Sequence, residues 1–593
     1  MIPRMFDMSA LRHAYRRGAL TPEQMLADLL PRIDAYDPAV WISRVDPAAL
    51  RAEARLLDAS RIDELPLFGI PFAVKDNIDA LPLATTAACP SFAFHPTEDS
   101  TIVRKLREAG ALMLGKTNLD QFATGLNGTR SPYGAPRSVF SHDYISGGSS
   151  SGSAVAVGAG LAAFSLGTDT AGSGRVPAAY NNLIGLKPTR GRISTAGVLP
   201  ACRSIDCVSV FANSAADAGL VLRVAEGLDA ADSLSRIGAE ISLPVRPVVG
   251  VLAEDQRDFA GDTGYAALYE AALAKAQELG WELRTFDFTP FRQAASLLYG
   301  ASFVAERYQT IRTFIASRPD AMDPTVLRII QGANGFSAAD AFRDIYLLQD
   351  LRAAAAHAIA GMDIVLLPTT PTIFKFDELL AEPITNNATL GIYTNFVNFF
   401  DQAAVAVPAG FRADGLPFGV TLIGPAFSDL ALLHLADQLH VALGAGAGVS
   451  RQMPTTRMAA PAEPLTKIVV AGAHLSGMVL NHELTALGAR LECATTTTAD
   501  YKLYALPTTP AKPGLARMPG FEGPGIAVEI WAMTPESFGK FVAALPAPMG
   551  IGKVSVADGG EYPGFLCEAH MLQSAADITS YGGWRNYIAS HSF

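Results

Sequence analysis

Ser173 lies between Gly172 and Gly174 in the run Gly-Thr-Asp-Thr-Ala-Gly-Ser-Gly-Arg, residues 167–175. Glycines on both sides leave the serine hydroxyl accessible and allow neighbouring backbone N–H groups to point the same way. A serine in such a turn can attack a carbonyl carbon while the amides bind the oxyanion that develops. Taken alone, the run is equally well interpreted as a polar turn between two structural elements.

Ser149 lies in a second run, Ser-Gly-Gly-Ser-Ser-Ser-Gly-Ser at 146–153, which leads into small apolar residues at 154–161. Serines before a compact apolar run are typical of a helix N-terminus, where free N–H groups and the helix dipole favour negative charge. A flexible Gly/Ser linker is the alternative, but linkers are not usually followed by a helix of small residues.

Lys75 ends an apolar, β-prone run at 69–75, so we expect its amine to lie partly inside the fold. A lysine that acts as a base near neutral pH needs burial to lower its pKa from the usual value of about 10.4. On this run alone, a lysine paired with Asp76 or Asp79 at a solvated strand end is the better interpretation.

Together the three segments predict a proton relay of two serines and a lysine. None of them contains a histidine, so a Ser-His-Asp arrangement is not indicated. In the relay, neutral Lys75 takes a proton from Ser149, Ser149 takes one from Ser173, and Ser173 attacks a carbonyl carbon. The same relay in reverse protonates the leaving nitrogen.

These segments resemble the amidase signature family of serine amidohydrolases. That family carries this lysine, a serine in Gly-Gly-Ser-Ser, and the nucleophile in Gly-Thr-Asp-Thr-Gly-Gly-Ser. The resemblance implies that Lys75 is the base, Ser149 the relay and Ser173 the nucleophile. It covers roughly residues 1–450, because later motifs at 366–371, 403–410 and 415–419 are also similar to the family.

The resemblance further implies an oxyanion hole formed by the backbone amides of Thr170, Ala171 and Gly172, with Ser173 itself. Two departures from the family pattern are visible. Ala171 stands where many relatives have glycine, and Ser151 interrupts the usual Gly-Gly after the serine pair. Neither removes a reacting group, so we expect both to affect the shape of the site rather than to abolish activity.

The elements that must position these residues are those of an α/β domain. A capping-box pattern at 21–24 starts a helix within a helical first 60 residues. Short apolar runs then alternate with helical ones, which predicts a mixed central sheet surrounded by helices. Expected strands lie at 66–74, 111–115, 206–211, 248–252, 363–367, 403–408 and 418–423; expected helices lie at 153–164, 215–226, 263–279, 291–316 and 339–359.

The chain is expected to divide into a catalytic domain at 1–450, a linker at 451–465 and a second domain at 466–593. The linker carries three prolines and no apolar period. The last 128 residues are enough for an independent α+β domain. In it we expect strands at 466–473, 488–493, 501–506 and 525–532, and a helix at 535–545.

Composition excludes several functional classes. With 593 residues, 49% hydrophobic and 17% charged, the chain is typical of a large globular protein. A net charge of −11 argues against nucleic-acid binding, because phosphate contacts need a basic face. Five cysteines favour reduced thiols and a cytoplasmic location, and Cys202 and Cys207 lack a second pair, so neither a metal nor another cofactor is expected. No signal peptide and no apolar stretch of about 20 residues is found, so no membrane association is expected.

Tyr299 and Arg307 lie eight residues apart in the helix expected at 291–316. At 100° per residue they are about 80° apart around that helix, on a shared side. A phenol and a guanidinium on one side can bind a small carboxylate. The alternative is a surface arginine paired with Glu306 and a tyrosine in the core.

The Tyr299–Arg307 segment, the runs 118–125 and 128–134, and the added domain together resemble the allophanate hydrolase subgroup of the family. This resemblance implies that Arg307 and Tyr299 hold the carboxylate of allophanate while Ser173 attacks the terminal carboxamide and expels ammonia. Release of N-carboxycarbamate would lead on to ammonia and carbon dioxide. It also implies an association with a urea carboxylase. The size and apolar composition of the chain favour a homodimer. The alternatives are a broad small-amide amidase, a catalytically silent scaffold, or a glutaminase-type amidotransferase subunit.

His474 lies in a glycine-containing run at 469–477 that is similar to the strand entry of the γ-glutamyl-cyclotransferase fold. The segment after the helix expected at 535–545 lacks the glutamate that a cyclotransferase acid would require, so that activity is not expected. His474 is the residue we select for chemistry in this domain, assisting decarboxylation of N-carboxycarbamate. A turn histidine that satisfies local backbone groups is an equally good interpretation.

Overall fold

A computed structural model describes residues 5–459, 465–509 and 511–591. By its contacts the chain divides into two compact units, Met1–Pro461 and Ala462–Phe593. The first unit is built on an 11-stranded sheet in the order β1-β3-β2-β6-β8-β7-β12-β13-β11-β9-β10. Its strands are β1 Trp41–Arg44, β2 Pro71–Lys75, β3 Leu112–Thr117, β6 Phe164–Asp169, β7 Ile184–Lys187, β8 Cys207–Ala212, β9 Val248–Leu252, β10 Glu282–Phe286, β11 Ile364–Pro368, β12 Ala403–Phe411 and β13 Pro417–Gly424.

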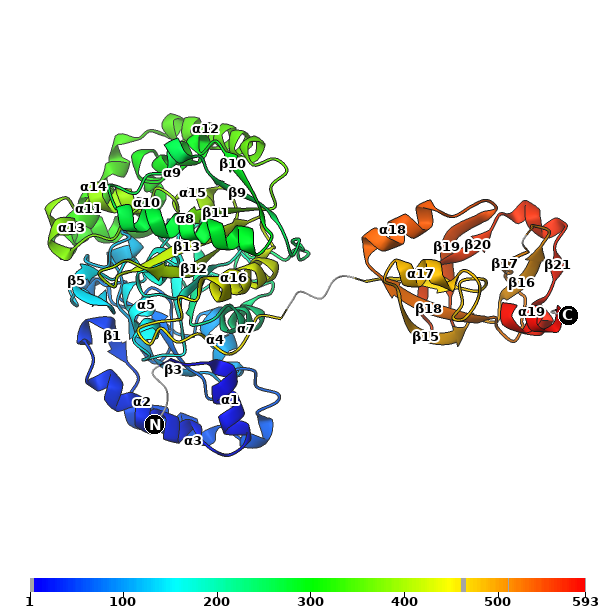
Figure 1. Cartoon of the computed structure of the whole chain (residues 1–593). Coiled ribbons are helices and arrows are strands. Elements are labelled where there is room, and N and C mark those ends of the chain that lie inside the picture. The colour runs from blue at the N-terminus through cyan, green and yellow to red at the C-terminus, as the bar shows by residue number, and fades with distance from the viewer. Residues whose placement is uncertain (1–4, 460–464, 510, 592–593) are drawn as a thin grey trace. The chain divides into compact units, whose positions relative to one another are not determined.

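The sheet is mixed, as expected from the sequence. Strand β2 pairs in parallel with β3 and β6, whereas β6 pairs antiparallel with β8. Figure 1 shows helices surrounding the sheet, and a separate hairpin joins β4 (Arg137–Ser138) to β5 (Ser141–Ile145). Because β2 and β6 are neighbours and run in the same direction, their C-terminal ends bring Lys75 and the turn that carries Ser173 to one edge.

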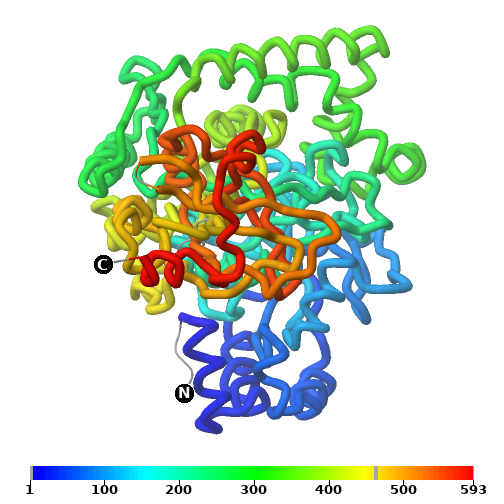
Figure 2. The backbone as a smooth tube through the Cα atoms, turned by 90° about the vertical axis from the view of Figure 1, so that its right-hand side faces the viewer, coloured from blue at the N-terminus to red at the C-terminus, as the bar shows by residue number. Residues whose placement is uncertain are grey.

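The helices of the first unit cover the sheet and extend beyond it. The capping box at Thr21 is present, since Gln24 N–H donates to the Thr21 hydroxyl at 3.2 Å. Figures 1 and 2 both show the first helices gathered at one end of this unit and α12 at its periphery. The helices are α1 Met8–Arg16, α2 Pro22–Asp34, α3 Pro47–Leu56, α4 Thr101–Glu108, α5 Ser151–Gly158, α6 Val176–Tyr180, α7 Ala215–Ala225, α8 Thr263–Glu278, α9 Thr289–Gly300, α10 Val304–Ser317, α11 Pro324–Gln331, α12 Ala338–Ala358, α13 Phe376–Ala381, α14 Thr385–Leu390, α15 Phe396–Phe399 and α16 Asp429–Leu443.

Helix α5 is buried along its whole length, which explains its small residues. A Cβ atom placed on Gly152 would lie 2.3 Å from the Val40 carbonyl oxygen and 2.6 Å from the Asn118 nitrogen. Both contacts are with backbone, so neither neighbour can turn aside. Only glycine at this position allows the helix to lie close enough to fix the position of Ser149, two residues before its start.

The prediction of a single helix at 291–316 is wrong, because the structure has two helices there, α9 and α10. Helix α9 ends at Gly300, and Ala301 adopts extended dihedrals of φ −133° and ψ −176°. The N–H of Ser302 then donates to the buried Asp344 carboxylate on α12 at 2.8 Å. A tertiary hydrogen bond thus replaces the helical continuation.

The segment expected to be a linker, 451–465, is described as far as residue 459 and again at residue 465. The hydroxyls of Thr455 and Thr456 donate to the Asp7 carboxylate at 2.6 and 2.7 Å. Met458 is buried in the core of the first unit. This part of the expected linker therefore lies against the first unit, while residues 460–464 lie outside the described residues.

The second unit is the smaller α+β domain expected from the sequence. Its core is formed by apolar residues of two sheets, with strand orders β15-β18-β14-β20-β19 and β17-β16-β21. Strands β17, β19 and β20 were not expected from the sequence. The elements are β14 Thr466–Val470, α17 Asn481–Ala486, β15 Arg490–Thr496, β16 Tyr501–Leu506, β17 Lys512–Arg517, β18 Ala527–Met533, α18 Pro535–Ala543, β19 Met549–Ser555, β20 Glu561–Cys567, β21 Ala576–Asp577 and α19 Trp584–His591.

We expect Gly152→Ala to lower the free energy of unfolding by about 1–3 kcal/mol, the usual cost of forcing extra volume into a packed interior. Denaturant unfolding of the full chain measures the change. Gly332→Ala is the matched control, because a Cβ there meets nothing within 4 Å. Equal stability of the Gly152→Ala and Gly332→Ala variants would show that α5 tolerates a methyl group.

Candidate active site

Lys75, Ser149 and Ser173 form a hydrogen-bonded row inside the first unit. The Nζ atom of Lys75 lies 2.8 Å from Ser149 Oγ, and the Ser149 hydroxyl donates to Ser173 Oγ at 3.0 Å. Lys75 and Ser149 are fully buried, and Ser173 is 2% exposed. The peptide bond between Gly148 and Ser149 is cis. These distances allow protons to pass along the row in either direction.

Burial decides the charge of Lys75. Removal from water lowers the pKa of its amine to about 7, against the opposing influence of nearby carboxylates, Asp120 first among them. Neither residue of the alternative interpretation pairs with this amine: Asp76 forms an ion pair with Lys116 at 3.1 Å, and Asp79 accepts from Thr85. Lys75 Nζ instead donates to Thr168 Oγ1 at 2.7 Å, a partner that the sequence did not indicate.

The turn that carries Ser173 is held by a buried ion pair. Asp169 accepts from the N–H groups of Gly172 and Gly174, both at 3.0 Å. Arg175 binds the same carboxylate through Nε at 3.0 Å and Nη2 at 2.9 Å. The acidic residue in the Gly-Thr-Asp run and the arginine two positions after the serine were the available signals for this pair, which sequence reasoning missed.

This ion pair changes the set of amides available to an oxyanion. The Gly172 N–H, one of the predicted donors, is already bound to Asp169. Among the described residues, the amides of Thr170, Ala171 and Ser173 have no hydrogen-bond acceptor. The Thr170 side chain is held separately, because its hydroxyl donates to the buried Asp206 carboxylate at 2.5 Å. Three backbone donors next to the Ser173 hydroxyl are thus left for a developing negative charge.

Tyr299 and Arg307 are in contact, but from two helices rather than one. Tyr299 is near the end of α9 and Arg307 is in α10, and Arg307 Nη2 donates to the Tyr299 hydroxyl at 3.2 Å. The argument from helical spacing was therefore wrong, although the two side chains do meet. Glu306, the alternative partner of this arginine, accepts from the Ser204 hydroxyl at 2.6 Å.

Arg307 is a buried cation that forms no ion pair with a carboxylate in the described residues, although the charges of Asp206 and Glu306 act on it from further away. It is 2% exposed, and within the described parts of the chain it has no ion pair with a carboxylate and no partner for Nε. Its other hydrogen bonds are to neutral groups, the Ala123 carbonyl at 3.3 Å and the Thr124 hydroxyl at 3.2 Å. The charge of Arg307 also lowers the pKa of Lys75, so the two lie in one electrostatic environment. An uncompensated buried charge costs several kcal/mol, and a bound anion would compensate it.

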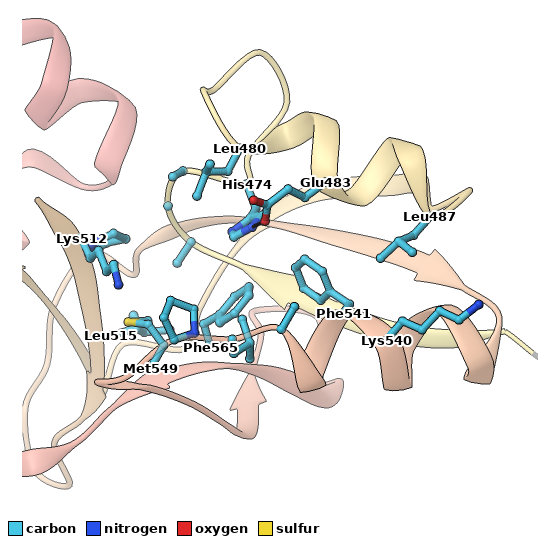
Figure 3. A pocket seen from close by; sticks show the side chains of 17 residues that line it. His474, Leu480, Glu483, Leu487, Lys512, Leu515, Lys540, Phe541, Met549 and Phe565 are labelled. Atoms are coloured by element: carbon cyan, nitrogen blue, oxygen red, sulfur yellow. Dashed lines mark hydrogen bonds and ion pairs between the residues drawn. The ribbon is translucent and has the colours of Figure 1, made fainter. Parts of the chain in front are cut away.

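His474 lines a cavity of about 500 Å³ in the second unit. Its Nε2 atom lies 2.9 Å from a Glu483 carboxylate oxygen, and its ring stacks on Phe565 with centroids 5.3 Å apart. Figure 3 shows His474 and Glu483 next to each other above the rings of Phe541 and Phe565. A side-chain partner thus orients this ring, and Glu483 is a residue that sequence reasoning missed.

Across 5–459, 465–509 and 511–591, no group of three or more His, Cys, Asp or Glu side chains is arranged to hold a metal ion. No helix in those same ranges is long and apolar enough to cross a membrane.

Comparison with known proteins relates both units to described families. Residues 24–433 match the Amidase family, and residues 466–589 match the Allophanate hydrolase C-terminal domain. Urea amidolyase from Lachancea kluyveri is 43% identical over 601 residues, which cover 96% of this chain and 32% of that protein. This chain therefore spans about a third of the length of the urea amidolyases that it matches.

Two further relatives are matched over most of their own length. A glutamyl-tRNA(Gln) amidotransferase subunit from Lacticaseibacillus paracasei is 31% identical over 464 residues, covering 72% of this chain and 95% of that protein. The solved structure of Kluyveromyces lactis allophanate hydrolase superimposes with a TM-score of 0.78 at 41% identity, covering 100% of both chains. The likeness to this structure includes both units.

Because burial lowers the pKa of Lys75 to about 7, we expect the reactivity of Ser173 to depend on pH. Below that pH the amine gains a proton and can no longer accept one from Ser149. The rate of Ser173 labelling by a fluorophosphonate probe should therefore fall about tenfold per pH unit below 7 and level off above it. Ser173→Ala is the unlabelled control. A labelling rate that is constant from pH 5.5 to 8.5 would contradict a lysine base.

Proposed function

The chain belongs to the amidase family, and we propose that it hydrolyses allophanate, with Ser173 as nucleophile, Ser149 as relay and Lys75 as base. The observation that carries the choice of substrate is the burial of Arg307 without an acidic partner in the described chain. Allophanate is a urea that bears a carboxylate on one nitrogen, so it offers both the scissile amide and the missing counter-ion. The resemblance to urea amidolyase and allophanate hydrolase supports the same substrate.

In the proposed reaction, Arg307 and Tyr299 hold the carboxylate of allophanate. Neutral Lys75 takes the proton of Ser149 as Ser149 takes that of Ser173, and Ser173 Oγ bonds to the terminal carbonyl carbon. The carbonyl oxygen becomes an oxyanion beside the amides of the 170–173 turn. The relay then returns a proton to the nitrogen, the carbon–nitrogen bond breaks, and ammonia leaves. Water attacks the acyl-enzyme through the same relay and releases N-carboxycarbamate.

The alternatives within the family explain less of the site. A broad small-amide amidase acts on an amide that need not carry an anion for Arg307. Glutamine, the substrate of a glutaminase-type amidotransferase subunit, does carry a carboxylate; here it is the 41% identity to allophanate hydrolase over both chains, rather than Arg307, that favours allophanate. The 31% identity to an amidotransferase is compatible with the shared chemistry of the first unit. A silent scaffold would have no use for three buried side chains kept at hydrogen-bonding distance.

The second step is assigned to the second unit. We propose that residues 1–450 form the catalytic domain and 466–593 a γ-glutamyl-cyclotransferase-like domain in which His474, oriented by Glu483, assists decarboxylation of N-carboxycarbamate. The cavity beside this pair supports a ligand site there, because it is concave, mostly apolar and carries few polar groups. The products of the complete sequence are ammonia and carbon dioxide.

The setting of the enzyme is also proposed. All five cysteines are unpaired, in keeping with a reducing, cytoplasmic location. The greater length of the urea amidolyase relatives and their name support association with a urea carboxylase. A homodimer is supported by exposed apolar side chains on the peripheral helix α12, where Phe342 and Tyr346 are 59% and 65% exposed.

Arg307→Ala should lower kcat/KM for allophanate by about 1.5–3 kcal/mol in transition-state binding, the range for hydrogen bonds to charged groups. Steady-state ammonia release measures the loss. Arg312→Ala, at an exposed position of the same helix, is the control and should behave as the wild type. Unchanged kinetics on allophanate for the Arg307 variant would remove this residue from substrate binding.

His474→Ala should leave the rate at which the first ammonia is released unchanged and should slow the release of the second. Early in the reaction, the ratio of ammonia released to allophanate consumed should fall from about two toward one, because the first cleavage yields one ammonia and the complete sequence two. The exposed His482, whose Nδ1 contacts the Val479 carbonyl, provides the control variant His482→Ala. A ratio of two in both variants would make the second unit structural only.

A further inference from the structure

One end of the segment 120–130 is fixed to the relay serine. The backbone N–H of Asp120 donates to the Ser149 carbonyl at 3.0 Å. Its fully buried side chain lies against the residue before that serine, since a Cβ placed on Gly148 would be 2.2 Å from Asp120 Oδ2. Any movement of Asp120 would therefore be passed directly to the Gly148–Ser149 peptide.

The Asp120 carboxylate also orders the rest of the segment. It accepts from the N–H groups of Gly128 and Arg130, both at 3.0 Å, and of Asn127 at 3.3 Å. The guanidinium of Arg130 then donates to the Thr124 carbonyl at 2.9 Å. Three backbone donors and a guanidinium hydrogen bond fix the path of the loop between its two ends.

A turn within the segment, at residues 122–124, holds Arg307. Phe122 and Ala123 have φ values of +51° and +53°, a region that non-glycine residues rarely adopt and that persists only where surrounding contacts impose it. This backbone presents the Ala123 carbonyl and the Thr124 hydroxyl to Arg307 Nη1. Both protons of Nη1 are thereby used.

The remaining hydrogen-bond donors of Arg307 lie on its Nε/Nη2 edge, the edge through which arginine binds carboxylates. With Nη1 occupied, the N–H of Nε has no partner among the residues that the structure describes, and Nη2 has one proton beyond the bond to Tyr299. In the same structure Arg175 binds the Asp169 carboxylate through this edge, Nε and Nη2, at 3.0 and 2.9 Å. Two parallel N–H groups match the two oxygens of a carboxylate. The contacts of Nη1 therefore determine which way the open edge faces.

We propose that the segment 120–130 is a strut that sets the position of Arg307 relative to Ser149, with Thr124 as the positioning residue for the guanidinium and Asp120 as the anchor. This inference rests on the proposed function, because the strut can select a substrate only if Arg307 binds the carboxylate of that substrate. Substrate selection then depends on a loop hydroxyl that does not itself touch the substrate.

The experiment is a double-mutant cycle on the full-length enzyme with allophanate as substrate. Thr124→Val keeps the shape of the side chain and removes the acceptor, so KM should rise about tenfold while kcat changes less. Thr124→Ser should restore KM to within about twofold of the wild type. In an Arg307→Ala background, Thr124→Val should have no further effect, because the group that it positions is gone.

Two further measurements separate positioning from a general structural role. Ser173 labelling by a fluorophosphonate probe needs the relay but no carboxylate, so Thr124→Val should leave its rate unchanged. Asp120→Asn keeps the backbone hydrogen bond to Ser149 but weakens the acceptor for the 127–130 amides and changes the group packed against Gly148, so it should slow labelling and raise KM together. If Thr124→Val does not fold, Thr124→Ala, which adds no bulk, is held to the same expectations.

The outcomes distinguish this inference from the proposed function. A wild-type KM for Arg307→Ala would overturn the anion site itself. A large effect of Arg307→Ala with a wild-type KM for Thr124→Val would overturn the strut alone. Equal, additive effects of Thr124→Val in both backgrounds, or slowed labelling in that variant, would show that the hydroxyl acts on general structure and would also overturn it.

Discussion

The proposed chemistry depends on an amine whose pKa is lowered to about 7 by removal from water, so that a large fraction of it is uncharged near neutral pH. Lys75 is fully buried at the end of β2, and desolvation outweighs the carboxylates that would favour its charged form. A solvated lysine would be protonated at neutral pH and could not take a proton from Ser149. The buried helix α5, closely packed at Gly152, contacts β2 and contributes to this burial.

The buried charges around this amine are of two kinds. Asp169 and Arg175 satisfy each other and stiffen the turn of Ser173, so they act as part of the scaffold. Within the described residues, Arg307 donates hydrogen bonds only to neutral groups and keeps its Nε/Nη2 edge open, which is the basis for the proposed ligand site. Both guanidinium groups are buried, so burial alone does not separate the scaffold from the proposed binding site; for these two arginines the pairing of the Nε/Nη2 edge does so.

The residues of the candidate site that lie in short, recognisable sequence patterns could be predicted from the sequence. Runs of glycine and serine indicated the turns of Ser149 and Ser173, and the apolar run before Lys75 indicated the end of a buried strand. The α/β class followed from alternating apolar and helical segments. Long-range partners carried no such signal: Thr168, Asp120 and Thr124 look like ordinary polar loop or strand residues until the fold brings them to Lys75, Ser149 and Arg307.

The break between α9 and α10 shows the same limit. Nothing in the local sequence marks Ala301 as extended, since the carboxylate that binds Ser302 comes from Asp344, 42 positions further along the chain. In the second unit, Glu483 is nine positions from His474 and pairs with it only because the chain turns back over the cavity. Contacts of this kind are set by tertiary packing, which overrides local periodicity.

That break has a consequence for how such a site can change over generations. The proposed reacting residues lie at the end of β2, in the turn after β6 and just before α5, whereas the proposed carboxylate-binding residues come from α9 and α10, two helices joined by three residues. A substitution at the joint can reorient a helix and redirect preference toward another acyl group without disturbing the bond-breaking machinery. Changes in substrate preference can thus arise in elements other than those that carry the proposed reacting residues. Such a separation allows one scaffold to serve many amides.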